Sequence, residues 1–296
     1  MKSENLTIGN RVFTWGARTY LMGVLNITAD SFSGDGLLAS AGQGDPLEAA
    51  LAQANRFVSA GVDILDVGGE STRPGAQPVS AEEEMGRVLP VVRALSALPE
   101  AIISIDTYRA VVAEAALQAG ANIVNDVWGL RADPDLAAVV ARHQAPVILM
   151  HNRSSWAHAE IKDRLGGRYI GMEYVDLIGD IQHELLESVA LAHAAGVPDE
   201  HIILDPGIGF GKTVEQNLEL IDRLGEIRAL GYPVLLGPSR KSFIGYTLDL
   251  PPDQRVEGTA AAVAIGIARR ADIVRVHDVS YMARVVRMAD ALTRRD

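Results

Sequence analysis

One pattern recurs along the chain and restricts its possible folds more than any other feature. A short apolar run, rich in β-branched residues, ends in a polar residue, and a loop with Gly or Pro then leads into an Ala-rich amphipathic stretch. Near-continuous apolar runs are typical of strands buried on both faces, and therefore of a parallel sheet. The eight runs occupy residues 19–26, 62–69, 102–107, 122–127, 146–151, 202–207, 233–239 and 272–278.

The stretches between these runs have the periodicity of helices that cover such a sheet. Clear examples are residues 48–61, 110–120 and 176–196, and each ends at a glycine, where a left-handed cap is expected. Eight β-then-α units predict an α/β fold, a (β/α)8 TIM barrel that forms one domain over residues 1–296. The rival is a doubly wound open sheet, which the missing dinucleotide-binding fingerprint after the first run disfavours.

Two segments depart from this repeat. Residues 6–22 alternate in polarity and contain turn signals at Gly9-Asn10 and Gly16, which predict an N-terminal β-hairpin that closes the bottom of the barrel. Residues 152–172 have the weakest periodicity and predict a long loop above the fifth strand.

Composition limits the classes of function. Hydrophobic residues make up 48% of the 296 residues, so a sizeable core can form, and the net charge of −11 argues against a nucleic-acid partner. No cysteine is present, which excludes disulfides and thiolate zinc sites. The N-terminus lacks the apolar core of a signal peptide, and the most apolar window, residues 259–268, is too short to span a bilayer. We therefore expect a cytoplasmic protein with no membrane partner.

Polar residues stand where the apolar runs end. In a β/α barrel the active site is built at the C-terminal ends of the strands. A lone Asp there usually caps a turn and a lone His is usually a satisfied core residue, but several carboxylates at equivalent strand ends favour a ligand pocket. The candidates are Asn26, Asp66, Thr72, Arg73, Asp106, Asn125, Asp126, His151, Asp205, Ser239, Arg240, Lys241, Arg275 and His277.

The stretch "DPGIGFGKT", residues 205–213, looks at first like a phosphate-binding loop. That motif needs a glycine where this chain has Pro206, so the spacing excludes it. The glycines instead give the backbone room to turn beside Asp205, and Lys212-Thr213 is expected to begin the next helix. In residues 237–245, two adjacent cations, Arg240 and Lys241, precede a predicted short helix, a combination that favours an anion.

Six motifs carry a resemblance to a known family. They are "LMGVLNITADSFSGDG", "DILDVGGESTRPGA", "SIDTYRAVVAEAALQAGANIVND", "LDPGIGFGKT", "SRKSFIG" and "VRVHDV". Together and in this order, over about residues 19–280, they resemble the dihydropteroate synthase family. The resemblance implies a transferase of folate biosynthesis that joins 6-hydroxymethyl-7,8-dihydropterin pyrophosphate to p-aminobenzoate and releases pyrophosphate. It also implies a (β/α)8 barrel, a magnesium ion as cofactor, and a homodimer.

The resemblance also assigns roles to individual residues. Asn26 is similar to the residue that binds the magnesium–pyrophosphate unit, and Arg275 with His277 to those that hold the pyrophosphate. Catalytic roles fall to Arg73, Asp106, Asp205 and Lys241. The pterin partners implied are Asp106, Asn125, Met150, Asp205, Lys241 and Arg275. On the p-aminobenzoate side the resemblance implies Thr72, Arg73, Pro74, Phe210, Arg240 and Ser242.

Two alternatives belong to other classes. A methyltetrahydrofolate-dependent methyltransferase would share the pterin pocket but not "ESTRPGA" or "SRKSFIG", and both are present. A non-catalytic pterin-binding barrel would be favoured by replacement of Asn26, Arg73 or Lys241, and all three are present. The sequence departs from the family's usual pattern at Ala29, at Arg109 and in residues 152–156.

Overall fold

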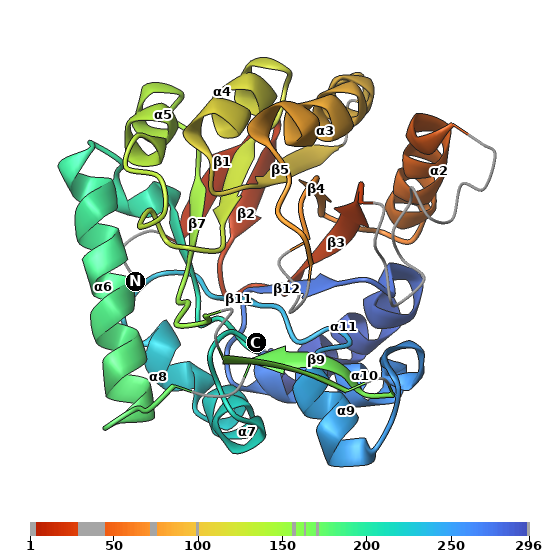
Figure 1. Cartoon of the computed structure of the whole chain (residues 1–296), viewed down its shortest axis with the longest axis vertical. Coiled ribbons are helices and arrows are strands. Elements are labelled where there is room, and N and C mark those ends of the chain that lie inside the picture. The colour runs from red at the N-terminus through yellow and green to blue at the C-terminus, as the bar shows by residue number, and fades with distance from the viewer. Residues whose placement is uncertain are drawn as a thin grey trace.

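The computed structural model describes residues 4–28, 45–71, 76–98, 101–155, 158–162, 164–169 and 172–294. Helices surround a central parallel sheet whose strands run in the order β10-β7-β6-β5-β4-β3-β12-β11 (Figure 1). The sheet strands are β3 (Tyr20–Asn26), β4 (Ile64–Gly68), β5 (Ile102–Asp106), β6 (Ile123–Asp126), β7 (Val147–Met150), β10 (Ile202–Asp205), β11 (Leu235–Leu236) and β12 (Ile273–Val276). All eight predicted strands are therefore confirmed.

The two edge strands of this sheet meet and close the barrel. Leu204 of β10 forms a parallel bridge with Val234, just before β11, and its N–H donates to the carbonyl of Pro233 at 2.9 Å. The predicted TIM barrel is confirmed, with a short seam between β10 and β11.

The predicted helices lie on the outside of the barrel. Glycines that follow three of them adopt positive φ, at Gly61 (88°), Gly120 (111°) and Gly196 (96°), as expected for left-handed caps. The helices are α2 (Pro46–Ser59), α3 (Ala81–Ser96), α4 (Ala110–Gln118), α5 (Leu136–Arg142), α6 (Leu177–Ala194), α7 (Val214–Asp222), α8 (Leu224–Arg228), α9 (Ser242–Leu248), α10 (Val256–Ala268) and α11 (Val279–Thr293), with 3-10 turns η2 (Asp199–His201) and η3 (Pro252–Gln254). In the described part of the chain, no helix combines the length and apolarity needed to cross a membrane.

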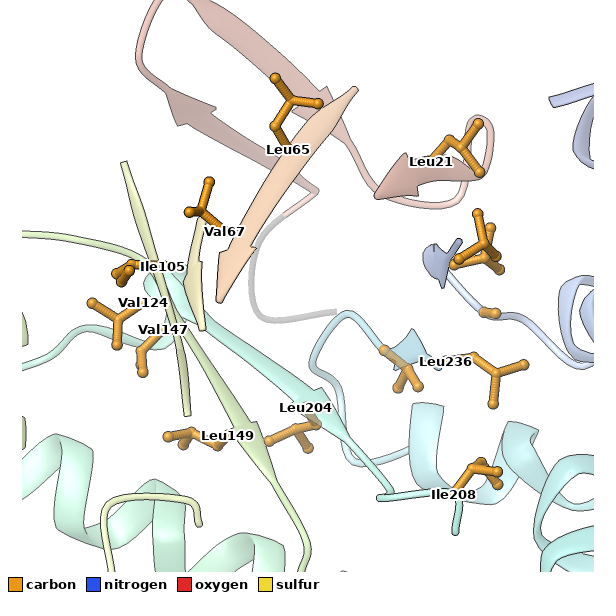
Figure 2. Close-up of a cluster of buried hydrophobic side chains, with 14 of the residues drawn as sticks. Leu21, Leu65, Val67, Ile105, Val124, Val147, Leu149, Leu204, Ile208 and Leu236 are labelled. Atoms are coloured by element: carbon orange, nitrogen blue, oxygen red, sulfur yellow. The ribbon is translucent and has the colours of Figure 1, made fainter. Parts of the chain in front are cut away.

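Alternation along each strand separates two cores. Outward-facing residues such as Leu65, Ile105 and Leu204 pack against the helices (Figure 2). Inward-facing residues at the strand starts form a second cluster that includes Ile64 and Ile102. Because side chains alternate along a strand, the next inward positions are reached two residues later, and there the chain turns polar.

The N-terminal hairpin closes the barrel at the strand starts. Strands β1 (Asn5–Ile8) and β2 (Arg11–Thr14) pair antiparallel, and Leu6, Ile8 and Phe13 join the inner cluster of isoleucines. This confirms the predicted closure of the barrel bottom. Solvent and ligands therefore reach the barrel interior only from the opposite end, so far as the described residues are concerned.

The segment after the fifth barrel strand differs from the prediction. Residues 152–172 were expected to be a long loop, but β8 (Ala159–Lys162) and β9 (Gly166–Tyr169) pair as an antiparallel hairpin. Gly166 takes a φ of +69° at the turn, a conformation that glycine adopts without a Cβ clash. Each strand is only four residues long, which is too short to produce a clear periodic signal.

Candidate active site

A cavity of about 280 Å³ opens at the C-terminal ends of the strands. Its wall contains residues from both the acidic and the basic parts of the predicted site. The predicted residues that line it are Asn26, Asp106, Asn125, Met150, Asp205, Phe210, Arg240, Lys241, Ser242, Arg275 and His277. Thr72, Arg73 and Pro74 lie outside the described residues.

Strand register brings the amide and carboxylate groups of the cavity to one level. Asn26 pairs with Gly68, Gly68 with Asp106, and Asp106 with Asn125 across three consecutive strand pairs. Glycine at the middle position leaves a gap between Asn26 and Asp106, because a Cβ at Gly68 would lie 3.4 Å from Asp106 Cβ and 3.8 Å from Asn26 Oδ1. Asp66 lies two residues before Gly68, one layer deeper, and is fully buried.

An arginine joins the two layers. Arg275 Nε donates to Asp66 Oδ2 at 2.6 Å, and Arg275 Nη2 donates to Asp106 Oδ2 at 2.6 Å. Asn125 Nδ2 also donates to Asp66, at 3.2 Å. Burial opposes the charge of Arg275, but the two carboxylates outweigh it and raise the pKa of this guanidinium. Burial raises the pKa of Asp106 to about 7 against the opposing effect of Arg275. Of these two groups, Asp106 is therefore the one that can gain or lose a proton near neutral pH.

Asp205 lies across the cavity, at the end of β10. Its Oδ1 accepts a hydrogen bond from the N–H of Gly207 at 2.7 Å, so it also shapes the glycine loop. Burial raises the pKa of this carboxyl, while the positive charge of Lys241 opposes that rise. A buried carboxylate with one oxygen committed to its own loop is suited to a ligand that brings hydrogen-bond donors.

The cationic side of the cavity is built by the turn before α9 and by the end of β12. Lys241 Nζ donates to the carbonyl of Ile208 and lies 4.5 Å from the ring centroid of Phe210, and burial lowers its pKa to about 8. Arg240 is held by Asp278, to which its Nε donates at 2.9 Å. His277 Nδ1 lies 2.9 Å from Ser239 Oγ.

Two of the strand-end candidates, Asp126 and His151, lie outside the cavity wall. Asp126 is buried outside the cavity wall and accepts hydrogen bonds from the N–H groups of Trp128 (2.8 Å) and Leu130 (2.5 Å). It therefore caps the loop after β6. His151 is also buried and outside the wall, as expected of a core histidine.

The sequence did not single out several residues of the cavity wall. The main group comes from the β8–β9 hairpin, and its only advance signal was the Gly166-Gly167 pair that marks the turn. The additional polar and apolar wall residues include Thr28, Glu70, Ser71, Ile161, Arg168, Tyr169 and Arg255.

A buried lysine holds the glycine loop from behind. Lys212 Nζ donates to the carbonyls of Gly207 (2.9 Å) and Phe210 (3.1 Å) and lies 3.0 Å from His151 Nδ1. The expectation that this stretch starts a helix is confirmed by Thr213, which caps α7 through a capping box. Lys212 itself, however, folds back under the loop, because its ammonium group can satisfy three acceptors there.

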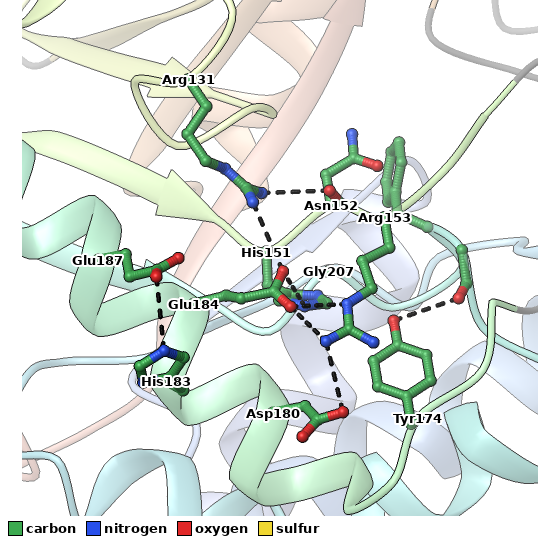
Figure 3. Close-up of polar contacts among 12 residues, drawn as sticks. Arg131, His151, Asn152, Arg153, Tyr174, Asp180, His183, Glu184, Glu187 and Gly207 are labelled. Atoms are coloured by element: carbon green, nitrogen blue, oxygen red, sulfur yellow. Dashed lines mark hydrogen bonds and ion pairs between the residues drawn. The ribbon is translucent and has the colours of Figure 1, made fainter.

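The other face of His151 meets an acidic residue of α6 (Figure 3). His151 Nε2 lies 3.2 Å from Glu184 Oε2, and Arg153 Nε donates to Glu184 Oε1 at 2.7 Å. Burial and the charge of Lys212 lower the pKa of His151 to about 4. The ring is therefore neutral at pH 7, and the tautomer that suits its neighbours has Nδ1 as acceptor toward Lys212 and the proton on Nε2, toward Glu184.

Glycines let the loop approach this network closely. A Cβ added at Gly207, which has a φ of +72°, would lie 1.9 Å from the carbonyl oxygen of His151. A Cβ at Gly211 would lie 2.8 Å from the carbonyl oxygen of Arg153. The glycines of residues 205–213 thus serve contact with the segment after β7, as well as the turn beside Asp205.

Lys212→Met is expected to change how stability depends on pH. Burial lowers the pKa of Lys212 to about 7, below its ordinary value of 10.5. Between pH 7 and 10.5 the folded protein therefore binds fewer protons than the unfolded chain. The free-energy cost of burying the charged Lys212 ammonium accordingly decreases as pH rises through this range. We expect the unfolding free energy of the wild type to rise relative to that of the variant between pH 7 and 10. Urea unfolding at several pH values measures this, and parallel profiles would contradict it.

A metal would find oxygen donors in the cavity but no ready-made protein cage. Among the residues that the structure describes, no three His, Asp or Glu side chains gather as a metal site. Asn26 offers a carboxamide oxygen at the cavity wall, near Asp106. Mg²⁺ usually keeps several waters and binds through few protein groups together with phosphate oxygens. The residues therefore fit a magnesium ion that is held largely by a phosphorylated ligand.

A larger groove, of about 970 Å³, lies between α2 and α11, away from the strand ends. Its inner polar groups are already paired, as in the ion pair of Arg18 Nη2 with Asp63 Oδ1 at 2.6 Å. The cavity at the strand ends, which collects carboxylates and cations from different strands, is therefore the candidate active site.

Comparisons with known proteins identify the family of this chain. Residues 22–277 match the sequence pattern of the family described as pterin binding enzyme. The chain is 48% identical to the dihydropteroate synthase of Bacillus subtilis (strain 168) over 275 residues, covering 93% of this chain and 89% of that protein. It is 50% identical to the dihydropteroate synthase of Synechocystis sp. (strain PCC 6803) over 290 residues, covering 98% and 95%.

Solved structures give the same result. The structure of a Clostridium difficile dihydropteroate synthase in the presence of pteroic acid superposes with a TM-score of 0.84 at 46% identity, covering 96% of this chain and all of that one. A Yersinia pestis dihydropteroate synthase in complex with a sulfonamide drug superposes with a TM-score of 0.87 at 37% identity, covering 97% and 98%. By sequence and by fold, the chain belongs to the pterin-binding enzyme family.

Proposed function

We propose that this chain acts as a dihydropteroate synthase in folate biosynthesis. It would join 6-hydroxymethyl-7,8-dihydropterin pyrophosphate to p-aminobenzoate and release pyrophosphate. The observation that carries the proposal is the cavity at the strand ends, where carboxylates and amides face lysine and arginine side chains. The relatives named dihydropteroate synthase support the same proposal. A further dihydropteroate synthase, that of Xanthomonas albilineans, has been solved with 4-aminobenzoic acid.

The pterin would bind between β6, β10 and the turn before α9. Its amidine edge presents adjacent N–H donors, which the buried carboxylate of Asp205 can accept. Asn125 would add an amide partner, Lys241 a donor, and Met150 an apolar surface; all four residues line the cavity. The hydrogen bond from Gly207 fixes the orientation of the Asp205 carboxylate before the ligand arrives.

The pyrophosphate would bind at the ends of β3 and β12. Asn26 would supply an oxygen ligand to Mg²⁺, and Arg275 and His277 would supply donors to the phosphate oxygens. When bound, magnesium would neutralise charge on the departing pyrophosphate. Arg275 keeps one terminal nitrogen, Nη1, that is committed to neither Asp66 nor Asp106.

The arylamine would approach from the side of Phe210 and Ser242. The resemblance adds Thr72, Arg73, Pro74 and Arg240 to this side. Arg240 takes a left-handed φ of 56° and is held by Asp278, so its backbone and side chain are fixed before substrate binds.

The reaction breaks the bond between the pterin methylene carbon and the pyrophosphate oxygen and forms a bond from that carbon to the amine nitrogen. Positive charge develops on the pterin methylene as pyrophosphate leaves, and the proton lost afterwards comes from the amine. The carboxylate of Asp106 would stabilise this charge in a site with little water. Its pKa of about 7 keeps a large share of the charged form available at neutral pH. Positioning and electrostatics supply most of the acceleration, and no general base is needed.

The test is a two-substrate assay of pyrophosphate release. We expect release only when dihydropterin pyrophosphate, p-aminobenzoate and Mg²⁺ are all present, and loss of release on addition of EDTA. Purified protein that releases no pyrophosphate with all three present would overturn the proposal. Methyl transfer from methyltetrahydrofolate to a corrinoid partner serves as the control reaction and is expected to be absent.

The assembly and location of the protein follow from the same proposal. We expect a homodimer in the cytoplasm, with the whole chain forming one barrel domain. Light scattering of the purified protein measures the first of these, and a molar mass of one 31.6 kDa chain would contradict it.

A further inference from the structure

The β8–β9 hairpin forms one side of the candidate active site. Ile161 of β8 and Gly167, Arg168 and Tyr169 of β9 all line the cavity. They share it with Phe210 and Ser242, which belong to the proposed arylamine side. In Figure 1 the hairpin crosses beside α9, and α9 and β9 are in contact. None of the hairpin residues was implied by the family motifs.

The hairpin is fixed at its turn. Arg255 Nη2 donates to the carbonyl of Leu165 at 2.8 Å, and Arg164 Nη1 donates to the carbonyl of Asp249 at 2.8 Å. Arg255 is itself 2% exposed and directs Nη1 to the carbonyl of Arg240. The turn is therefore tied to the segments on both sides of α9, and the wall has a defined position.

The hairpin continues an aromatic surface toward this end of the cavity. The ring of Tyr169 stacks on that of Phe210, with centroids 6.3 Å apart and an interplanar angle of 27°. The Nζ atom of Lys241 lies 4.5 Å from the Phe210 centroid on the way to the pterin side. Aromatic side chains at this place suit a benzene ring as the second substrate.

Arg168 lies in the cavity wall next to this aromatic surface, and its two terminal guanidinium nitrogens are available as hydrogen-bond donors. Its Nε donates to Glu160 Oε2 at 2.7 Å, and its guanidinium carbon lies 4.0 Å from the ring centroid of Tyr246. These contacts hold the guanidinium plane but leave both terminal nitrogens without a hydrogen bond to any described residue. The side chain is 30% exposed. A positioned guanidinium with open terminal donors recognises a carboxylate.

The two neighbouring arginines of the cavity wall, Arg240 and Arg255, already donate hydrogen bonds to other groups of the protein. Arg255 directs its nitrogens to the main-chain carbonyls of Leu250, Arg240 and Leu165. Arg240 is paired with Asp278 through two nitrogens. Among the described arginines on this side of the cavity, Arg168 is the one whose terminal nitrogens both remain open to an acid group.

We propose that Arg168 is a specificity-determining residue that binds the carboxylate of the arylamine substrate. The inference rests on the proposed function, because it takes the second substrate to be an aromatic amine that carries an acid group. Arg168 would thereby favour an acidic arylamine over a neutral one of the same shape, and it would leave the pterin unaffected.

The test compares two arylamines in two variants. p-Aminobenzamide has the ring and amine of p-aminobenzoate but no charge. We expect Arg168→Met to lower kcat/KM for p-aminobenzoate about tenfold, mainly through KM, while kcat/KM for p-aminobenzamide stays within about twofold. The matched control is Lys162→Met, which removes a charge from the same hairpin outside the cavity wall and is expected to change neither value.

Two outcomes would overturn the proposal. One is an unchanged preference for the acid in Arg168→Met, and the other is an equal loss for both amines, which would indicate damage to the hairpin. Arg168→Lys separates charge from shape and should retain part of the preference. If the wild type releases no pyrophosphate with either amine, the proposed function fails. Calorimetric binding of the two amines to wild type and Arg168→Met then still measures the recognition of the carboxylate.

Discussion

Asp205→Asn is expected to lower the affinity for dihydropterin pyrophosphate by about 100-fold or more while the protein stays folded. The carboxylate lines the cavity and, as proposed, accepts donors from the pterin edge. An asparagine replaces one of its two acceptor oxygens with an N–H₂ group, so that donor faces donor. Calorimetric titration of the purified variant with the pterin substrate measures the loss.

The same substitution is expected to leave stability intact. Burial raises the pKa of Asp205, so the charged form is less favourable in the folded protein than in the unfolded chain. Because the pKa of Asp205 is higher in the folded protein than in the unfolded chain, its ionisation lowers the unfolding free energy as pH rises above about 4. An asparagine carries no charge and removes this destabilisation. The introduced carboxamide would keep an oxygen for the Gly207 N–H, so thermal melting at pH 7.5 should occur no lower than in the wild type.

Asp126→Asn provides the matched control at another strand end. Asp126 is buried like Asp205 but lies outside the cavity wall and uses both oxygens to cap its loop. An asparagine can replace only one of these acceptors, so this variant should melt at a lower temperature and bind the pterin within a few-fold of wild type. Unchanged pterin affinity in Asp205→Asn would refute the assignment of Asp205, and equal losses in both variants would indicate a general effect of strand-end substitution.

The sequence was informative where local pattern and tertiary structure agree. Each strand of the barrel is buried on both faces, so an apolar run such as residues 147–150 is visible without knowledge of its neighbours. The polar residue that ends each run, such as Asp106, marks the cavity because all the strands are parallel. The positions of Gly61 and Gly120 likewise followed from their backbone requirement.

Other features depend on partners that are distant in sequence. The β8–β9 hairpin is specified by its turn and by its anchors, Arg255 and Asp249, which lie more than eighty residues away. Lys212 looked like a helix start because its partner, His151, follows β7 and lies 61 residues earlier in the chain. Asp66 and Asp126 both lie in the C-terminal half of similar runs, but only the folded structure shows that Asp66 pairs with Arg275 and that Asp126 caps a loop. Local patterns do not contain these contacts.

Arg275→Met is expected to lower the unfolding free energy by about 3 kcal/mol at pH 7.5 and to abolish pyrophosphate release. In the folded protein Arg275 separates and neutralises Asp66 and Asp106, which are 0% and 15% exposed. Without the guanidinium, two buried carboxyl groups share one region of low dielectric constant, and one of them must be protonated for the chain to fold. Urea unfolding of wild type and variant between pH 5 and 8 measures the effect.

The unfolding free energy of Arg275→Met is expected to fall as pH rises. Burial already raises the pKa of Asp106 to about 7, and loss of the arginine that opposes this rise would raise it further. The folded variant then binds more protons than the unfolded chain above about pH 4, so its stability should fall as pH rises and recover toward pH 5. Asp66→Asn in the same chain removes the second carboxylate and should restore most of the stability at pH 7.5, without restoring activity. If the single and double variants are equally unstable at every pH, Arg275 acts through packing and its charge has no structural role.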